Sequence, residues 1–432
     1  MFSRLLCRLA APNASGLALL RRVVSAALLL ALVTSSGCGR KSATAPVVAA
    51  PESARLAEEL RHRHARAGAV HLEGTSSSGA LWVIDKPAAW NRSLVVYVHG
   101  YTLPHAPVAL PNNGEIRDSL LARGYAVAAS SFSSNGFAVP EGIRESDALR
   151  ETFERRVGEP RHTYIFGQSL GGLIGMLLTQ RRPEHYDGSF LVCGIVGTSI
   201  EEIQYIGDIR VLFDTVYPGV IPGDLEHSTP ITDPNTQLIG PIVTAVTANP
   251  QGLGIIQLLA RHPLAGNSSQ EVVTSLINAI GFSMQAGSDL YERCHDTSFF
   301  DNASWTYTSA ALPPPLLADI NSRVRRYTRA PEATAFLRRY GEPASDIRIP
   351  MMSLHTTRDP QVPVFHEDRL AQVNTSPLLI QRRDERYGHC TFTAGELMVH
   401  FNDLVNFARS QHRRHHDDDL VAGGDQGAER QP

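Results

Sequence analysis

The sequence places a serine between two glycines where an apolar, strand-like run meets a helix-like run. Residues 164–168 read Tyr-Ile-Phe-Gly-Gln, Ser169 follows, and residues 170–176 read Leu-Gly-Gly-Leu-Ile-Gly-Met. Because glycine lacks a Cβ, the backbone can turn tightly at Gly167 and Gly171 and leave the serine hydroxyl exposed above a sheet. The free N–H groups of the helix N-terminus would point at any anion that forms beside this hydroxyl. The pattern therefore predicts a nucleophilic serine on a strand-to-helix turn.

A serine hydroxyl is a weak nucleophile at neutral pH, so it needs a base, and the base needs a carboxylate to orient it. After a turn of this kind, the acid and then the histidine are expected later in the chain, each following a strand. Asp359 fits the acid, because it follows the strand-like run 350–354 and opens a proline-rich loop. His389 fits the base, because it follows the last strand-like run, 377–382, and a glycine precedes it. We therefore predict that Ser169, Asp359 and His389 form a triad.

Other acids and histidines compete for these two roles. Asp384 and Glu385 lie on the last strand–loop segment, and Asp346 lies before the penultimate strand, so none follows a strand in a way that aims it at the histidine. His355 and His366 compete with His389. We expect both to pack in the interior or to face solvent.

A tetrahedral intermediate at the serine would need two preformed hydrogen-bond donors. The first candidate is the N–H of Leu170, directly after the serine. The second is the N–H of Tyr101, in the loop that follows the apolar run 94–98 and the dipeptide His99-Gly100. The Tyr101 hydroxyl could bind the intermediate as well, and His99 could be a buried structural residue.

Strand-like and helix-like runs alternate on both sides of a long insertion. Residues 69–197 alternate between the two types, and residues 347–410 resume the alternation, which predicts a mostly parallel, doubly wound sheet. Residues 198–346 carry helical patches without a clear strand, which favours an inserted helical cap; a separate domain is the alternative. Residues 411–432 are highly charged, and we expect a structureless, solvated tail rather than a metal site there.

The first 38 residues predict an export signal. Arginines precede the apolar run 23–33, and small residues ending at Cys38 follow. The run is shorter than the about 20 residues that a membrane-spanning helix needs. The ending resembles a bacterial lipoprotein box, which would make Cys38 the lipidated first residue; because Ser35 replaces the usual leucine, ordinary cleavage that releases a soluble protein is the alternative. Residues 39–68 are expected to be a linker.

Charge and cysteine usage narrow the possible partners and covalent links. The 432-residue chain has a formal net charge of −3, which argues against a nucleic-acid partner. Of its five cysteines, Cys193, Cys294 and Cys390 belong to the mature body. Export permits a disulfide, but three thiols leave the pairing open, and buried free thiols are equally compatible with the sequence.

Four motifs, in this order along the chain, resemble the α/β-hydrolase superfamily. They are His-Gly after a strand, Gly-x-Ser-x-Gly around Ser169, Arg-Asp-Pro-Gln-Val-Pro around Asp359, and Gly-His at His389. The match covers residues 69–197 and 347–410 and leaves the cap unassigned. The resemblance implies an α/β-hydrolase fold with a large helical cap insertion, a Ser–His–Asp triad, an acyl-enzyme, and no metal or organic cofactor.

Some positions depart from particular branches of this superfamily. The sequence His-Gly-Tyr at 99–101 is neither the His-Gly-Gly-Gly of hormone-sensitive-type lipases nor the His-Gly-Gly-Pro-Gly of proline iminopeptidases. A serine nucleophile disfavours dehalogenases and epoxide hydrolases. Cys390 beside His389 is similar to feruloyl esterases and tannases, in which that cysteine is bridged to one preceding the serine. Gln168 occupies the second position here, so we expect the bridge to be absent.

These features predict an exported serine hydrolase acting on small-molecule carboxylic esters, with the cap covering the pocket and setting acyl selectivity. Contact with a membrane is expected only through the lipid anchor. One alternative is a peptidase or amidase of the prolyl-oligopeptidase type, which a charged anchor for a peptide terminus in the cap would favour. Another is a catalytically inactive, hydrolase-like binding protein of the cell envelope, which would have no need to keep all three triad positions.

Overall fold

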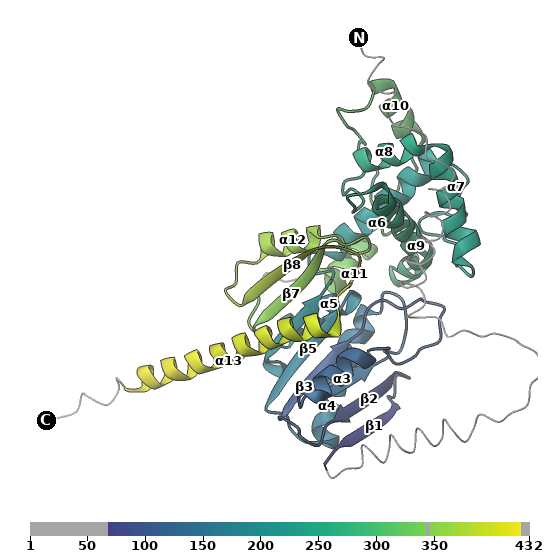
Figure 1. Cartoon of the computed structure of the whole chain (residues 1–432). Helices are drawn as coiled ribbons and strands as arrows, with labels where there is room; N and C mark the ends of the chain where they lie inside the picture. Colours follow the sequence, from purple (N-terminus) through teal and green to yellow (C-terminus); the bar gives the residue numbers. More distant parts are fainter. Residues whose placement is uncertain (1–67, 343–345, 425–432) are drawn as a thin grey trace, which may run out of the picture.

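The computed structural model describes residues 68–342 and 346–424, so the predicted export signal, Cys38 and nearly all of the linker lie outside the described residues (Figure 1). An eight-stranded sheet runs in the order β1-β2-β4-β3-β5-β6-β7-β8. β2 is antiparallel to both of its neighbours, and every other pair is parallel. The strands are β1 (Val70–Thr75), β2 (Leu81–Lys86), β3 (Ser93–Val98), β4 (Ala126–Ser130), β5 (His162–Gln168), β6 (Gly188–Val192), β7 (Met351–Arg358) and β8 (Leu379–Tyr387).

Burial of the strands follows their sequence pattern. Every residue of β3, β4 and β6 is buried, as expected for apolar runs covered on both faces of a parallel sheet. The edge strand β1 instead alternates half-buried and exposed residues. The central strands thus form a rigid platform whose carboxyl ends meet at one edge.

Helices cover both faces of this sheet (Figure 1). On one face, α13 packs Phe401 against Tyr125, Tyr164 and Phe166. On the other face, α4 and α5 contact β3, β4, β5 and β6. The core helices are α3 (Gly114–Ala122), α4 (Val139–Arg156), α5 (Leu170–Arg181), the short 3₁₀ helix η1 (Pro183–His185), α12 (Phe365–Val373) and α13 (Ala394–Gly424).

A helical insertion lies between β6 and β7, and residues 198–342 of the described chain hold no strand. Its buried apolar side chains, such as Ile242 and Ile277, belong to the same hydrophobic cluster as Ile165 and Leu173 of the core. The insertion therefore packs onto the sheet through a shared apolar core. Its helices are α6 (Ser199–Val216), the π-helix η2 (Asn235–Ile239), α7 (Gly240–Ala248), α8 (Pro250–Leu259), α9 (Ser269–Arg293), α10 (Pro314–Arg323) and α11 (Pro331–Gly341).

The described residues contain no single helix with the length and hydropathy to cross a membrane. One bent pair, Asn235–Ala248 with Pro250–Leu259, passes that test by length and composition only.

The C-terminal helix is longer than the sequence predicted. We expected the chain to be structureless from residue 411, but α13 continues to Gly424, so that prediction is wrong up to this point. The helix starts at a capping box, in which Thr393 N–H donates to Glu396 Oε2 (2.8 Å) and Glu396 N–H donates to Thr393 Oγ1 (3.2 Å). From residue 396 to 422 the sequence has no proline or glycine, so nothing in the backbone chemistry ends the helix where the charged residues begin.

Candidate active site

Ser169 occupies the sharp turn between β5 and α5, as the sequence predicted. Its φ of 55° and ψ of −124° place it in a region that non-glycine residues adopt only under strain. The turn is fixed by two backbone hydrogen bonds: Ser169 N–H donates to the carbonyl of Val192 (2.9 Å), and Gly172 N–H donates to the carbonyl of Ser169 (2.8 Å). The serine hydroxyl is thereby held at the carboxyl edge of the sheet.

The two glycines that flank the serine are required by close backbone packing. A Cβ on Gly171 would lie 2.0 Å from the carbonyl oxygen of Val98, and one on Gly167 would lie 2.2 Å from the carbonyl oxygen of Gly171. Both distances are far below a van der Waals contact, so only glycine fits. The turn can therefore approach β3 closely enough to bring Ser169 beside the loop that follows that strand.

The structure brings together the three side chains that the sequence singled out. His389 Nε2 lies 2.9 Å from Ser169 Oγ, and His389 Nδ1 lies 2.8 Å from Asp359 Oδ2. The other carboxylate oxygen of Asp359 accepts the N–H groups of Gln361 (2.9 Å) and Val362 (3.0 Å). Since a carboxylate can only accept, Nδ1 carries the imidazole proton and Nε2 presents its lone pair to the serine hydroxyl.

The competing acids lie elsewhere. Asp384 pairs with Arg386 at 2.8 Å, and Asp346 pairs with Arg348 at 2.6 Å. Glu385 is largely exposed and lies 3.6 Å from Arg358. None of the three contacts His389 among the described residues.

The competing histidines are interior residues. His355 is fully buried and donates from Nε2 to the carbonyl of Val362 (2.7 Å), so it supports the loop that carries Asp359. His366 is also fully buried, and it contacts Glu202 at 2.8 Å. Burial lowers the pKa of both histidines, to about 4 for His366.

The two predicted oxyanion donors flank the serine. Leu170 is the first residue of α5, where backbone N–H groups have no acceptor within the helix. Tyr101 follows Gly100, at which a Cβ would lie only 3.0 Å from Ser169 Cβ, so this loop passes directly over the serine. His99 fixes the loop: it is buried, stacks on Phe132 with ring centroids 4.0 Å apart, and contacts the carbonyl of Gly100 through Nδ1 (2.7 Å).

Comparison with known proteins gives matches to part of the sequence and to the fold. Residues 72–240, less than half of the chain, match a tannase-like family of unknown function. No curated protein matches the sequence at a significant level.

Solved structures with a similar fold have low sequence identity to this chain. Mouse alpha/beta hydrolase domain-containing protein 10 is 13% identical, with a TM-score of 0.37, over 78% of this chain and 98% of that one. An esterase from Pyrococcus furiosus is 12% identical, with a TM-score of 0.39, over 79% and 91%. A monoacylglycerol lipase from Paleococcus ferrophilus is 14% identical, with a TM-score of 0.31, over 74% and 90%.

The topology decides the fold. The strand order, the antiparallel β2 and the serine turn directly after β5 are those of an α/β-hydrolase sheet. This chain has the α/β-hydrolase fold. The resemblance that the sequence motifs carry is thus confirmed at the level of the fold, which by itself does not fix an activity.

An apolar cavity adjoins the serine of this α/β-hydrolase fold. It has a volume of about 50 Å³ and lies between the serine turn and the cap, with Ile203 of α6 and Phe282 and Leu290 of α9 in its wall. The cap thus forms one side of a cavity beside Ser169, whose own side chain is half-buried.

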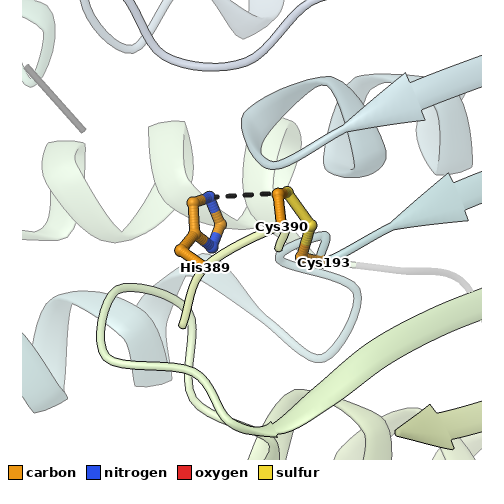
Figure 2. Close-up of side chains that lie close together, drawn as sticks. All are labelled: Cys193, His389 and Cys390. Carbon is orange, nitrogen blue, oxygen red and sulfur yellow. Dashed lines mark hydrogen bonds between the residues drawn. A yellow bond between two sulfur atoms is a disulfide. The ribbon is translucent and has the colours of Figure 1, made fainter. Parts of the chain in front are cut away.

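A disulfide joins Cys193 and Cys390 beside this site, with Cα atoms 5.5 Å apart (Figure 2). The bridge to the position before the serine is absent, as expected from Gln168, and the pairing that the sequence left open among the three cysteines is Cys193 with Cys390. β6 lies next to β5, and Val192 is the residue that pairs with Gln168. Cys193 is the next residue after Val192. A cysteine directly after the neighbouring strand thus takes the place of one before the serine. Cys294 stays a buried free thiol, and burial raises its pKa to about 12.

Cys193, Cys390 and His389 also form a group whose possible ligand atoms lie within 4.8 Å of one another. Figure 2 shows the imidazole beside the bridge, with Nε2 3.8 Å from the Cys390 sulfur. Both sulfurs belong to the disulfide and both imidazole nitrogens face Ser169 and Asp359, so the bridge and the hydrogen-bonded chain account for this cluster.

Proposed function

We propose that the protein is a serine hydrolase that cleaves carboxylic esters through an acyl-enzyme. One observation carries the proposal: the unbroken chain from Ser169 Oγ through His389 to the buried Asp359 carboxylate, with contacts of 2.9 and 2.8 Å. Such a chain gives a serine the base that it lacks and gives that base a fixed orientation.

The reaction follows from these positions. His389 Nε2 accepts the hydroxyl proton as Ser169 Oγ attacks the acyl carbon, and the oxyanion that forms accepts hydrogen bonds from the N–H groups of Leu170 and Tyr101. The imidazolium then donates its proton to the leaving alkoxide as the ester C–O bond breaks. Water, deprotonated by the same nitrogen, attacks the acyl-enzyme, and the carboxylic acid leaves with the serine restored.

The cavity favours esters over peptides. Among its described lining residues, Glu202 is the one ionisable acid, and it lies in the cap, where a peptidase would hold a terminal ammonium. Burial raises the pKa of Glu202 well above its usual value, which disfavours the charge that such an anchor needs. The remaining walls are mainly apolar, as an acyl chain requires.

Turnover of a chain-length series of p-nitrophenyl esters, beside aminoacyl-p-nitroanilides, tests the proposal. We expect burst kinetics with the esters and a loss of at least about 10⁴-fold in kcat in Ser169→Ala. Turnover of the anilides alone would support the peptidase alternative. No turnover of either the esters or the anilides, together with no labelling of Ser169 by a fluorophosphonate, would support the binding-protein alternative.

We also propose that the chain is exported and tethered to a membrane through a lipid on Cys38. The support is the order of arginines, an apolar run and small residues before that cysteine. Cys38→Ala should release the protein from the membrane fraction, whereas Cys7→Ala, which removes a cysteine from inside the signal, should leave it bound. Recovery of Cys38→Ala in the membrane fraction would refute the tether.

A further inference from the structure

The donor loop, residues 101–106, carries the second oxyanion donor and is held by a separate segment of the core, residues 134–137. Gly136 N–H donates to the carbonyl of Thr102 (3.0 Å), and these two residues form an isolated antiparallel bridge. The buried Asn135 side chain adds two hydrogen bonds: its Oδ1 accepts from Thr102 Oγ1 (2.9 Å), and its Nδ2 donates to the carbonyl of the loop's last residue (2.7 Å). Segment 134–137 therefore sets the position of the donor loop.

Segment 134–137 is in turn fixed by two side chains of the cap helix α9. Asp289 Oδ2 accepts the N–H of Phe137 (2.7 Å). Arg293, one turn later on the same face of α9, donates from Nη2 to the carbonyl of Asn135 (2.8 Å). Arg293 Nε also donates to Asp289 Oδ1 (2.9 Å), and the two side chains are only 16% and 10% exposed. We call Asp289 and Arg293 the α9 pair.

Gly136 shows how closely the segment and the helix fit. Its φ is 79°, a left-handed backbone conformation that favours glycine. A Cβ at this position would lie 2.4 Å from Asp289 Oδ2. The carboxylate of Asp289 therefore occupies the space that any larger residue at position 136 would need.

Tyr101, the donor residue itself, also lies against α9. Its ring packs on Phe282 with ring centroids 5.5 Å apart. Burial raises the pKa of its hydroxyl well above the usual value, the carboxylate of Asp289 raises it further, and the guanidinium of Arg293 opposes this, so the hydroxyl lies within the field of both charges. The donor loop thus meets α9 through the Tyr101 side chain as well as through segment 134–137.

A donor stabilises an oxyanion most when it is fixed before the reaction begins. We propose that Asp289 and Arg293 are positioning residues of the oxyanion hole, which hold the Tyr101 N–H in place through segment 134–137, so that the hole is complete only when α9 is docked on the core. Neither residue is among the described residues that line the cavity beside Ser169. The inference rests on the proposed function and gives the cap a part in the chemistry of that same site.

Substitutions in the α9 pair test the inference through kcat. Asp289→Ala removes the acceptor for Phe137 N–H, and Arg293→Met removes the donor to Asn135 while keeping an unbranched stem. Each should lower kcat for a p-nitrophenyl ester about 10- to 100-fold and change KM less than about 3-fold, because a displaced donor weakens binding of the oxyanion rather than of the ester. Asp289→Asn and Arg293→Lys, which keep an acceptor and a donor respectively, should each recover most of that loss.

Asp319→Ala and Arg323→Met are the matched controls. This pair has the same i, i+4 spacing on a cap helix, with Arg323 Nε 3.0 Å from Asp319 Oδ2, but Arg323 donates to the carbonyl of Thr215 within the cap. Both controls should keep the wild-type kcat. Labelling with a fluorophosphonate to completion counts the competent serines in every variant. A lower count with an unchanged kcat per labelled serine in the α9 pair variants would mean a purely structural role and would overturn the inference.

A trifluoromethyl ketone reports on the oxyanion hole directly. Ser169 Oγ adds to its carbonyl carbon, the hydroxyl proton passes to His389, and the carbonyl electron pair becomes an oxyanion that needs the same donors. Its Ki should rise in Asp289→Ala and Arg293→Met by the factor by which kcat/KM falls. The Ki of the methyl ketone with the same chain, which binds without this addition, should not change. An unchanged Ki for the trifluoromethyl ketone beside a lowered kcat would overturn the inference.

Two further measurements keep the inference testable if a variant of the α9 pair does not fold or if the wild type hydrolyses no ester. Thr102→Val, which keeps the shape of the side chain, removes the hydrogen bond to Asn135 from the other end of the same link and should lower kcat in the same way. Amide hydrogen exchange in residues 101–106 needs no turnover and should rise about 10-fold or more in Asp289→Ala but not in Asp319→Ala. That rise without any ester turnover would refute ester hydrolysis and still support the coupling, whereas unchanged exchange in residues 101–106 would overturn the inference.

Discussion

The loop after β7 selects Asp359 as the carboxylate that faces His389. Backbone N–H groups of Gln361 and Val362 bind one of its oxygens, which leaves the other for the imidazole. His355 donates to the carbonyl of Val362 and so holds the same loop from inside the protein. The carboxylate is thus oriented before any substrate binds, and this preorganisation keeps the proton of His389 on Nδ1.

Asp359→Asn should reduce kcat for a p-nitrophenyl ester by about 10³- to 10⁴-fold with little loss of folding. The amide can present its NH₂ group to Nδ1, which favours the tautomer whose Nε2 carries a proton and cannot accept one from Ser169. Asp384→Asn is the matched control, because Asp384 pairs with Arg386 rather than His389. A kcat within 10-fold of the wild type in Asp359→Asn would contradict the assignment of the acid.

The sequence predicted the three residues of the hydrogen-bonded chain because each stands in a local pattern: a glycine-flanked turn, a loop after a strand, a glycine before a helix. It did not predict the pairing of Cys193 with Cys390, which are 197 positions apart. Nor did it predict the contact between Glu202 and His366, which are 164 positions apart. Those contacts depend on which strands are neighbours and on how the cap folds back, and neither leaves a local pattern.

At the level of elements, the disulfide joins the end of β6 to the turn between β8 and α13. That turn carries His389 between two residues with left-handed backbone, Gly388 (φ 117°) and Cys390 (φ 51°). Thr356 Oγ1 on β7 donates to the carbonyl of Gly388 (2.7 Å). The bridge and this hydrogen bond hold the turn on both sides of the histidine, so the position of His389 depends on two neighbouring strands.

Opening the disulfide should therefore weaken both folding and ester turnover. We expect the double variant Cys193→Ser/Cys390→Ser to lose about 2–5 kcal/mol of unfolding free energy and to show a lower kcat, because the His389 turn is no longer tied to β6. Denaturant unfolding and burst kinetics measure the two effects. Cys294→Ser, which removes a free thiol, should keep the wild-type sensitivity of turnover to reductant. Full turnover in the double variant would show that the bridge does not position His389.

The elements themselves were predictable to different degrees. Continuous apolar runs predicted β3 and β6, because a strand that is buried on both faces of a sheet needs such a run. The cap was predicted from the lack of strands, but its helix packing was not, since several of its helices are held by one another rather than by strong local signals. The end of α13 was missed because a charged composition is compatible with both a helix and a solvated coil.

For the whole molecule, the junction between cap and core contains two histidines, the half-buried His262 and the fully buried His366. His262, which follows α8 of the cap, stacks on Phe365 of the core with ring centroids 4.0 Å apart. His366 is the next residue, and Phe365 also lies against it. Burial lowers the pKa of each histidine to about 4. Both are therefore neutral in the folded protein at neutral pH, and the junction contains no charge from either ring.

The stability of the whole chain should consequently decline as pH falls from about 6.5 towards 4. In that window the unfolded chain takes up a proton at each histidine, at a pKa of about 6.5, while the folded protein does not, so proton binding favours unfolding. His262→Phe keeps the stacking on Phe365 and removes one of the two sites. Its Tm should therefore fall less than that of the wild type between pH 7 and pH 5, by roughly 2 °C. His105→Phe, at an exposed histidine, is the control, and its Tm should change with pH as that of the wild type does. An unchanged pH dependence of Tm in His262→Phe would show that the junction does not contribute to acid unfolding.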